Sequence, residues 1–350
     1  MKVVLCVFFG NEQILHVRKI LESLGCEVEF VPSDSYRQVC PYGKKKLDEM
    51  GFHGGRQKYL QSVRNRFHRL LRDFRPDMVL FVNTPKDILT PEDVKEIGQA
   101  VPTICWFVDG LAENTEENKE VRAYFSCFRR IYVFEHADVA YLQKQNIEAT
   151  YLPVGYNDAF ADVPPEEKSI DILFIGSPFY PRREILEQVA KAASQNQWKL
   201  KIFGPFYDGK YPWKKFLFKK KFPHLYSYLE NRRVSSEEAA ALYAKSKICL
   251  NIHDPKHKSP NPRTFEILAA GSFELTDTRD YWGGLTPGQD IVGYGNMEEL
   301  IENLKRYLTD DAAREKIAAC GKTRVVDAMK TENLLRRILT DTKIAQKNES

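Results

Sequence analysis

The sequence predicts an α/β fold of two doubly wound, Rossmann-like domains that face a cleft. Short apolar runs alternate with amphipathic stretches along the chain, which is typical of parallel strands covered by helices. The chain has 350 residues, which is enough for two such domains with their own cores. Residues 155–169 contain Pro164, Pro165 and several acidic side chains, as is common in a linker between domains.

Residues 1–155 predict the first domain. Each predicted strand is a short apolar run, and each predicted helix repeats its apolar residues at the spacing of one helical face. Gly25 follows the first helix as a C-terminal stop. The predicted strands are 3–9, 27–31, 78–82, 103–108, 131–134 and 151–153. The predicted helices are 12–24, 57–74, 91–99 and one that ends at Gln145.

Residues 156–330 predict the second domain, and residues 331–350 predict a final helix with a frayed polar tail. Ser235 is the expected N-cap of one helix of this half. The predicted strands are 170–175, 199–203, 248–252 and 273–276. The predicted helices are 182–196, 236–244, 263–270, 297–308, 310–326 and 331–345.

The composition is that of an ordinary globular protein, with 43% hydrophobic and 29% charged residues and a net charge of +4. This charge argues against a general polyanion binder. The seven cysteines form no C-x-x-C pair, so we expect buried free thiols in a reducing compartment. The first ten residues read as a buried strand and not as a signal peptide, and no run of eighteen apolar residues occurs. The expected location is the cytoplasm.

Candidate ligand-binding residues follow from the predicted sheets. In open α/β sheets, ligands bind beyond the carboxyl ends of the strands. In the first domain this rule selects Gly10, Asn11, Asn83, Thr84, Asp109, Glu135 and His136. In the second domain it selects Gly176, Ser177, Gly204, His253 and Asp277.

The segment from Ser259 to Asp277, "SPNPRTFEILAAGSFELTD", predicts a loop, a short helix and a buried strand. Two prolines keep the chain out of a helix until Arg263, and Gly271 suits the helix end. The helix N-terminus and Arg263 attract phosphate, while Glu266 can accept hydrogen bonds from ribose hydroxyls. The segment therefore predicts a nucleotide-sugar site.

This segment resembles the donor-binding region of GT-B glycosyltransferases, and in detail that of the CgeB-like group. The group's pattern is present as Ser246, Leu250, Asn251, Asn261, Arg263, Thr264, Phe265, Glu266, Ala270, Gly271, Leu275, Thr276 and Asp277. Residues 151–157, "YLPVGYN", are similar to the hinge before the group's second domain. The resemblance implies a GT-B fold whose final helix crosses back to the first domain.

The resemblance also implies a function and a donor site. The second domain would bind a nucleotide sugar, the first would bind a hydroxyl acceptor on a cell-surface glycan, a lipid-linked saccharide or a protein, and no cofactor or metal would be required. The turn at Gly176 and Ser177 and the following Arg182 would bind the donor diphosphate. The implied donor-binding residues are Gly176, Ser177, Arg182, Gly204, Asn251, His253, Asn261, Arg263, Thr264, Phe265 and Glu266. Retaining GT-B families carry two Glu residues separated by seven others, and Glu266 would be the second. Lys258 stands at the position of the first, so the resemblance does not decide the anomeric outcome.

Two residues of the first domain are candidates for acid–base catalysis. An inverting transferase needs a general base near the acceptor hydroxyl. Asp109 in "WFVDGL" is the first candidate, with a turn-forming Asp before Gly110 as the alternative. His136 is the second candidate, with a capping or packing role as the alternative. His253 and His257 have an H-x₃-H spacing, but an Asp–Pro pair between them favours a loop, so no metal site is expected.

Two basic regions leave alternatives open. Residues 210–222, from Lys210 to Phe222, interleave six lysines with aromatic residues. They form either a surface excursion packed on the domain or an amphipathic element that docks on anionic lipid at the inner membrane. No nucleic-acid motif accompanies them, so no nucleic-acid partner is expected. The arginines at 56, 64, 66, 69, 72 and 75 suit either an anionic acceptor or a solvated basic face.

Two other functions share this plan. A nucleotide-sugar epimerase would have acids and bases around the donor sugar itself and would isomerise a nucleotide sugar without an acceptor. A non-catalytic nucleotide-sugar-binding protein would bind the nucleotide without turnover.

Overall fold

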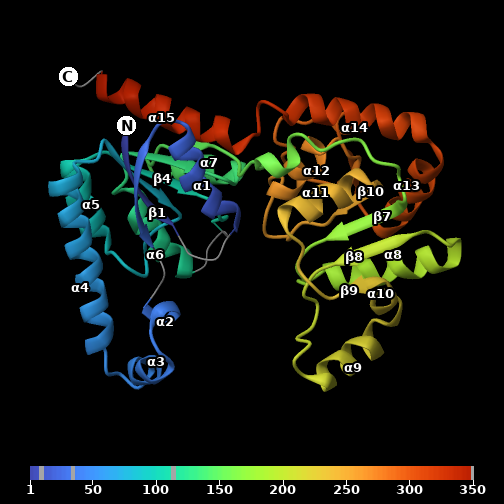
Figure 1. The fold of residues 1–350 in the computed structure, drawn as a ribbon, viewed down its shortest axis with the longest axis horizontal. Coiled ribbons are helices and arrows are strands. Elements are labelled where there is room, and N and C mark those ends of the chain that lie inside the picture. The colour runs from blue at the N-terminus through green and yellow to red at the C-terminus, as the bar shows by residue number, and fades with distance from the viewer. Residues whose placement is uncertain (8–11, 33–35, 112–115, 348–350) are drawn as a thin grey trace. The chain divides into compact units, whose positions relative to one another are not determined.

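The computed structural model describes residues 1–7, 12–32, 36–111 and 116–347 (Figure 1). The chain divides into two compact units. Unit 1 comprises Met1–Pro153 and Thr331–Ser350, and unit 2 comprises Val154–Lys330. Each unit contains one six-stranded parallel sheet covered by helices, which confirms the predicted fold class.

The sheet of unit 1 has the strand order β2-β1-β3-β4-β5-β6, and all its pairings are parallel. Its central strands are buried on both faces, which explains why their sequences are nearly continuous apolar runs. The strands are β1 (Lys2–Val7), β2 (Glu27–Pro32), β3 (Met78–Val82), β4 (Thr103–Phe107), β5 (Arg130–Val133) and β6 (Thr150–Tyr151).

The helices of unit 1 include two short ones, α2 and α3, that precede the long α4. A single π-helical turn, Leu70–Phe74, continues α4. The helices are α1 (Glu12–Ser23), α2 (Tyr36–Val39), α3 (Tyr42–Glu49), α4 (Gly54–Arg69), α5 (Pro91–Ala100), α6 (Glu116–Phe125), α7 (His136–Gln143) and α15 (Thr331–Lys347).

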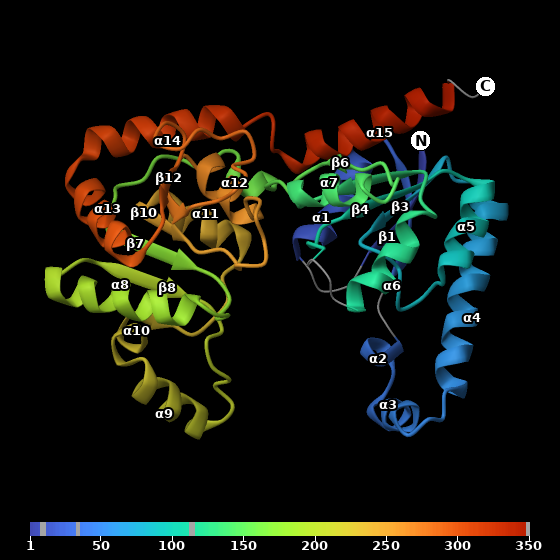
Figure 2. The ribbon, with the colours of Figure 1, turned by 180° about the vertical axis from the view of Figure 1, so that it is seen from behind.

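The last helix, α15, belongs to unit 1 although it follows unit 2 in the chain. It packs beside α1, and Figure 2 shows it along the same side of the unit. Tyr132 donates a hydrogen bond of 2.7 Å to Asp341, and Arg130 forms an ion pair of 3.2 Å with the same carboxylate. The predicted return of the final helix to the first domain is confirmed.

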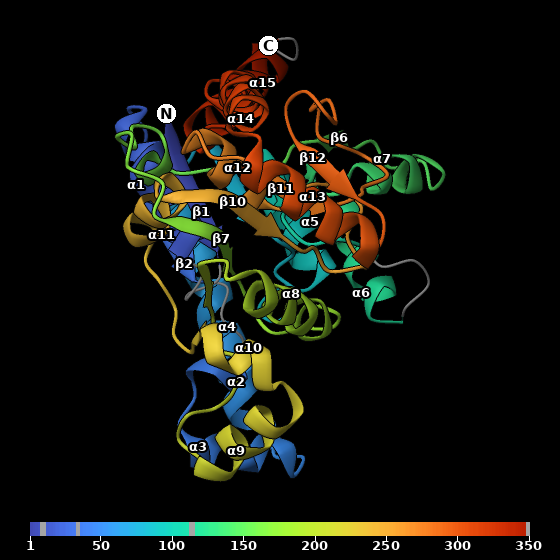
Figure 3. The ribbon, with the colours of Figure 1, turned by 90° about the vertical axis from the view of Figure 1, so that its right-hand side faces the viewer.

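The sheet of unit 2 has the order β12-β11-β10-β7-β8-β9. Helices α8 and α13 cover one face and α11 and α12 the other (Figure 3). The strands are β7 (Ile170–Ile175), β8 (Leu200–Phe203), β9 (Leu229–Glu230), β10 (Ser246–Asn251), β11 (Glu274–Asp277) and β12 (Val292–Tyr294). The helices are α8 (Arg182–Asn196), α9 (Pro212–Lys221), α10 (Pro223–Tyr228), α11 (Ser236–Ala244), α12 (Pro262–Ala269), α13 (Met297–Thr309) and α14 (Asp311–Val325).

The predicted linker, 155–169, is only partly a linker. Tyr156 forms an isolated bridge with Lys330, and its hydroxyl donates to the carbonyl of Val326. A 3₁₀ turn, Asp158–Phe160, follows, and Phe160 is 1% exposed in the core of unit 2. The prediction is wrong for this first part, because two aromatic side chains there are anchored in the core.

Other differences lie at helix starts and in short elements. Helix α12 begins at Pro262 and not at Arg263, since proline fits the first helical position, where no backbone N–H is needed. The sequence did not predict α2, α3, α6, α9, α10, β9 or β12, most of which are short. The ends of the first predicted strand, Phe8 and Phe9, and the candidates Gly10 and Asn11 lie outside the described residues.

Candidate functional site

The start of α12 is fixed by its N-cap. The side chain of Asn261 accepts a hydrogen bond of 3.2 Å from the backbone N–H of Thr264, and Pro262 occupies the first helical position. From Thr264 onward the helix is buried. Phe265 is fully buried, so its side chain packs the helix against the hydrophobic core of unit 2.

A buried polar network holds this N-terminus against the sheet. Asn251 Nδ2 lies 3.0 Å from Asn261 Oδ1, 3.1 Å from Thr264 Oγ1 and 2.8 Å from Glu274 Oε1. The Thr264 hydroxyl also donates to Glu274 at 2.9 Å. Residues predicted as donor ligands, Asn251, Asn261 and Thr264, are therefore brought together, and their side chains bond to one another.

Glu274 is the member of this network that the sequence analysis missed. It is 0% exposed and is the first residue of β11, where its carboxylate accepts hydrogen bonds from Asn251 and Thr264. Burial raises the pKa of Glu274 to about 7, although the two hydrogen bonds act in the opposite direction. A glutamate inside the apolar run "SFELT" is the signal that could have identified it.

Arg263 lies beside Glu266 and Tyr243 inside unit 2. Burial acts to lower the pKa of Arg263, but Tyr243 and Glu266 outweigh it and hold the pKa above the usual value. Glu266 is 6% exposed. The Nε atom of Arg263 is buried and has no hydrogen-bond partner within the described part of the chain. The predicted pair of Arg263 and Glu266 is thus present, with guanidinium donor capacity left for a ligand.

Arg182, at the start of α8, is a buried cation. Its side chain is held by the carbonyls of Ile252, at 2.6 Å, and Ser177, at 3.1 Å, and its guanidinium lies 3.8 Å from the ring centroid of Phe179. No carboxylate of the described residues forms an ion pair with it, and it is only 3% exposed. Burial and the charge of Arg263 lower the pKa of Arg182 to about 9. The guanidinium groups of Arg182 and Arg263 therefore repel each other, and an anion bound beside them would relieve this repulsion.

Gly176 and Gly204 let β7 and β8 end in close contact beside Arg182. A Cβ atom at Gly204 would lie 2.0 Å from the carbonyl oxygen of Gly176, and Gly204 has a φ of 154°. A Cβ at Gly176 would lie 3.0 Å from Arg182 Nη1. Glycine is required at position 204, a Cβ at position 176 would crowd the side chains of Phe174 and Arg182, and Ser177 contributes its carbonyl to Arg182.

His253 positions the loop before α12. Its Nδ1 lies 2.9 Å from Asp277 Oδ1, and its Nε2 accepts a hydrogen bond of 3.1 Å from the backbone N–H of Asn261. This pattern requires the neutral imidazole with the proton on Nδ1, and burial lowers the pKa of His253 in the same sense. Asp277 also pairs with Arg279 at 2.8 Å. Both ring nitrogens of His253 are therefore occupied by protein atoms.

Metal-ligating side chains do not cluster in the part of the chain that the structure describes. No group of three or more His, Cys, Asp or Glu side chains that could hold a metal ion occurs there.

In unit 1, the candidate base Asp109 is exposed at the end of β4. Its Oδ2 accepts a hydrogen bond of 3.1 Å from Asn83, which follows β3, and Asn83 Oδ1 accepts from the N–H of Val108 at 2.8 Å. Asn83 adopts the left-handed conformation, with a φ of 68°. The strand-end rule thus selected both members of a real contact, and Asn83 orients the carboxylate.

His136, the second candidate, begins α7 and is exposed. Its ring packs edge-on against Tyr151, with 5.7 Å between the ring centroids. Asp138, two residues further on, is 4% exposed and accepts a hydrogen bond of 2.9 Å from the backbone N–H of Leu111. The sequence analysis missed this Asp138 contact, which fixes the loop after Asp109.

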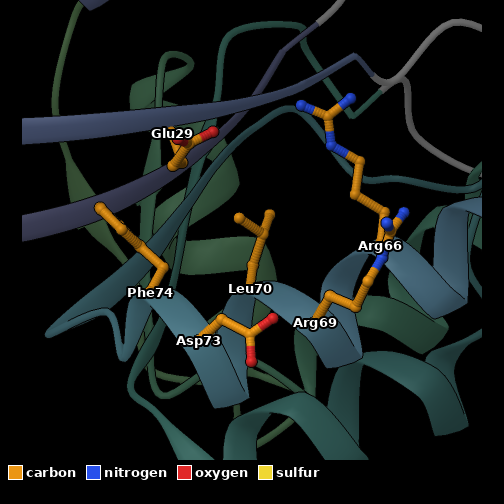
Figure 4. A pocket seen from close by; sticks show the side chains of 6 residues that line it. All are labelled: Glu29, Arg66, Arg69, Leu70, Asp73 and Phe74. Atoms are coloured by element: carbon orange, nitrogen blue, oxygen red, sulfur yellow. The ribbon is translucent and has the colours of Figure 1, made fainter.

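A separate open pocket of about 450 Å³ lies in unit 1 between β2 and the helix α4 with its π-helical turn. Figure 4 shows Leu70 and Phe74 pointing from the helix toward the strand that carries Glu29. It is lined by Glu29, Arg66, Arg69, Leu70, Asp73 and Phe74.

Three of the six arginines around α4 are engaged with protein groups. Arg64 pairs with Asp93 at 2.9 Å, Arg72 with Asp73 at 2.7 Å, and Arg66 donates to the carbonyl of Phe30 at 2.5 Å. Two carboxylates also line the pocket, which opposes an anionic ligand. These contacts favour the interpretation of this region as a solvated basic face.

Comparisons with known proteins agree with this geometry. A protein-family model described as glycosyl transferase-like matches residues 182–340. The spore protein CgeB of Bacillus subtilis (strain 168) is 27% identical over 288 residues, which cover 75% of this chain and 81% of that protein.

Solved structures show the same fold. A glycosyltransferase from Rickettsia africae ESF-5 superposes with a TM-score of 0.71 at 13% identity, covering 99% of both chains. Anabaena HepE, solved in complex with UDP, superposes with a TM-score of 0.63 at 12% identity, covering 98% of this chain and 100% of that one. The fold is therefore that of GT-B glycosyltransferases. The matched family model and the similarity to CgeB support a CgeB-like glycosyltransferase, as the pattern over residues 246–277 predicted.

Proposed function

We propose that the protein transfers a sugar from a nucleotide-sugar donor bound in unit 2 to an acceptor hydroxyl, without a required metal. The observation that carries this proposal is Arg182, a buried guanidinium that lies near a second one, Arg263, and has no carboxylate partner among the described residues. A departing nucleoside diphosphate brings negative charge, and preorganised cations and helix N-termini stabilise it. The UDP complex of the similar HepE fold supports the same class of donor.

The remaining roles follow from the geometry of each unit. Glu266, next to Arg263, would accept hydrogen bonds from the ribose hydroxyls. Unit 1 would bind the acceptor, a glycan, a lipid-linked saccharide or a protein. Asp109, oriented by Asn83, would remove the acceptor proton as the general base, with His136 as the second candidate.

The donor proposal is tested by a thermal-shift screen against UDP-, GDP-, CMP- and dTDP-sugars, without metal and then with magnesium. One donor class is expected to raise the melting temperature, since a ligand at 100 times its Kd stabilises the native state by about 2.7 kcal/mol. For a unit of this size that corresponds to roughly 5–10 °C. The shift should be reduced in Glu266→Gln. If no donor raises the melting temperature of the wild type, the proposal is wrong.

The catalytic proposal is tested in the same protein by release of the nucleoside diphosphate in the presence of candidate acceptors. Asp109→Asn should keep the donor-induced shift and lose at least about 100-fold in transfer rate, because general base catalysis contributes 10²–10⁴-fold. An isomerised donor formed without an acceptor would instead identify an epimerase. Donor binding without turnover under any acceptor would identify a non-catalytic binding protein.

We further propose that α9 contacts an anionic membrane surface on its cytoplasmic side, which would bring the enzyme to a lipid-linked acceptor. Phe218 and Phe222 anchor the helix in the core. Trp213, Phe216 and Leu217, at the spacing of one helical face, are 58%, 65% and 52% exposed. Lysines flank this face, and residues 209–222 contain no acidic residue. Two aromatic residues thus pack inward, and the three apolar residues that face outward support the proposed membrane contact.

The described part of the chain contains no helix that is long and apolar enough to cross a membrane. A contact through α9 would therefore be peripheral, made by one face of the helix and its lysines.

The variant Lys215→Glu/Lys219→Glu/Lys220→Glu tests this contact. It should bind vesicles containing 30% phosphatidylglycerol at least tenfold more weakly than the wild type, because each lysine near an anionic surface contributes about 1 kcal/mol. The matched control, Lys191→Glu/Lys305→Glu/Lys316→Glu, changes three exposed lysines of the same unit and should bind within twofold of the wild type. Equal losses in both variants would show that only net charge matters and would refute a contact through α9.

A further inference from the structure

A second amphipathic surface lies on unit 1, in and just after the short helix α3. Four large apolar side chains there are strongly exposed: Tyr42 (80%), Leu47 (50%), Met50 (64%) and Phe52 (66%). Together with Lys44, Lys45 and Lys46 they are called the α3 surface below. A concentration of exposed apolar side chains within eleven residues marks an interaction surface.

The orientation of α3 explains why these side chains face outward. Asp48 is the inward residue of the helix, 2% exposed, with one carboxylate oxygen 2.8 Å from His53 Nδ1. At 100° per residue, Tyr42, Leu47 and Met50 lie on the side of the helix opposite Asp48. Figure 1 shows α3 beyond the N-terminal end of α4, away from the sheet of unit 1. The apolar side is therefore held outward by the buried Asp48 contact.

The charge of this surface identifies its partner. Lys44, Lys45 and Lys46 belong to α3, and Arg56 and Lys58 follow in an exposed stretch. The acidic residues between 41 and 58 are Asp48, which is buried, and Glu49. Exposed aliphatic and aromatic side chains among lysines suit a bilayer interface, where apolar groups enter the acyl boundary and the lysine ammonium groups meet anionic headgroups.

We propose that the α3 surface binds the interface of a membrane that contains anionic lipids. A second copy of the chain is a poorer partner, because like lysine clusters would face each other across a symmetric contact. Leu47 and Met50 would have no role in binding a soluble polyanion. The α3 surface belongs to unit 1 and α9 to unit 2, so this proposal does not depend on α9 or on the donor chemistry.

The test uses the full chain carrying Lys215→Glu/Lys219→Glu/Lys220→Glu, so that α9 does not mask the contribution of α3. Co-sedimentation with vesicles of 30% phosphatidylglycerol in phosphatidylcholine is measured before and after adding Lys44→Glu/Lys45→Glu/Lys46→Glu. We expect at least a tenfold loss of the remaining binding. The matched control adds Lys19→Glu/Lys95→Glu/Lys144→Glu, three exposed lysines of the same unit, and should change binding by less than twofold.

A second variant, Leu47→Ser/Met50→Ser/Phe52→Ser, tests the apolar part of the α3 surface on the same background. It removes exposed side chains only, so its melting temperature should equal that of its parent, and its binding should fall at least fivefold. Unchanged vesicle binding in this variant, or an equal loss in the lysine control, overturns the proposal. A shift from dimer to monomer in sedimentation velocity on making the serine variant would also overturn it, because the partner would then be a second copy.

Discussion

Replacing Arg182 with methionine is expected to lower kcat/KM for sugar transfer by about 10²–10³-fold, the usual effect of removing one group that stabilises transition-state charge. The reason is the placement of this guanidinium, which is 3% exposed and lies near Arg263 with no carboxylate partner among the described residues. The same change should abolish the rise in melting temperature caused by the nucleoside diphosphate. The measurements are steady-state transfer rates and thermal shifts with and without the diphosphate.

The unliganded Arg182→Met protein is the critical comparison. Because burial and Arg263 disfavour the cation, its loss should leave the melting temperature of the free protein within a few degrees of the wild type. Arg263→Met should behave differently, since Arg263 interacts favourably with Glu266 and Tyr243 and its removal should also lower the stability of the free protein. Arg306→Met, at an exposed arginine of the same unit, is the control and should change neither quantity. Retention of the diphosphate effect in Arg182→Met would contradict the assignment.

The sequence predicted those parts of the site that depend on local order along the chain. Strand ends follow from apolar runs, so Asn83 and Asp109 were both selected, and the structure joins them by a hydrogen bond of 3.1 Å. The loop, cap and helix around Asn261 likewise follow from two prolines and the residues between them. These features need no knowledge of which elements are neighbours in space.

Other parts of the site depend on neighbours that are distant in the sequence. The apolar run around Glu274 predicted a strand. It did not predict that the Glu274 carboxylate accepts hydrogen bonds from Asn251 and Thr264. That no carboxylate of the described residues pairs with Arg182 is likewise a property of the folded unit. The outward face of α3 could not be predicted either, since it depends on the burial of Asp48.

The polar network gives a second test, because Glu274 makes stability depend on pH. Its pKa is raised from 4.5 to about 7 in the folded protein. The folded state therefore binds more protons than the unfolded state between these values, so the stabilisation is full below pH 4.5 and is lost as pH rises through 7. The shift corresponds to about 3 kcal/mol of unfolding free energy. Glu274→Gln keeps an acceptor for Asn251 and Thr264 and cannot ionise.

We therefore expect Glu274→Gln to gain stability relative to the wild type as the pH is raised from 5 to 8. Urea unfolding at several pH values measures this difference, and subtracting the two proteins removes the contribution of every other titrating group. Glu302→Gln, at an exposed glutamate of the same unit, is the control and should follow the wild type at each pH. Parallel stability curves for Glu274→Gln and the wild type would mean that Glu274 ionises normally in the folded state. The network would then hold a carboxylate at neutral pH, with Arg263 as the nearby cation that offsets its charge.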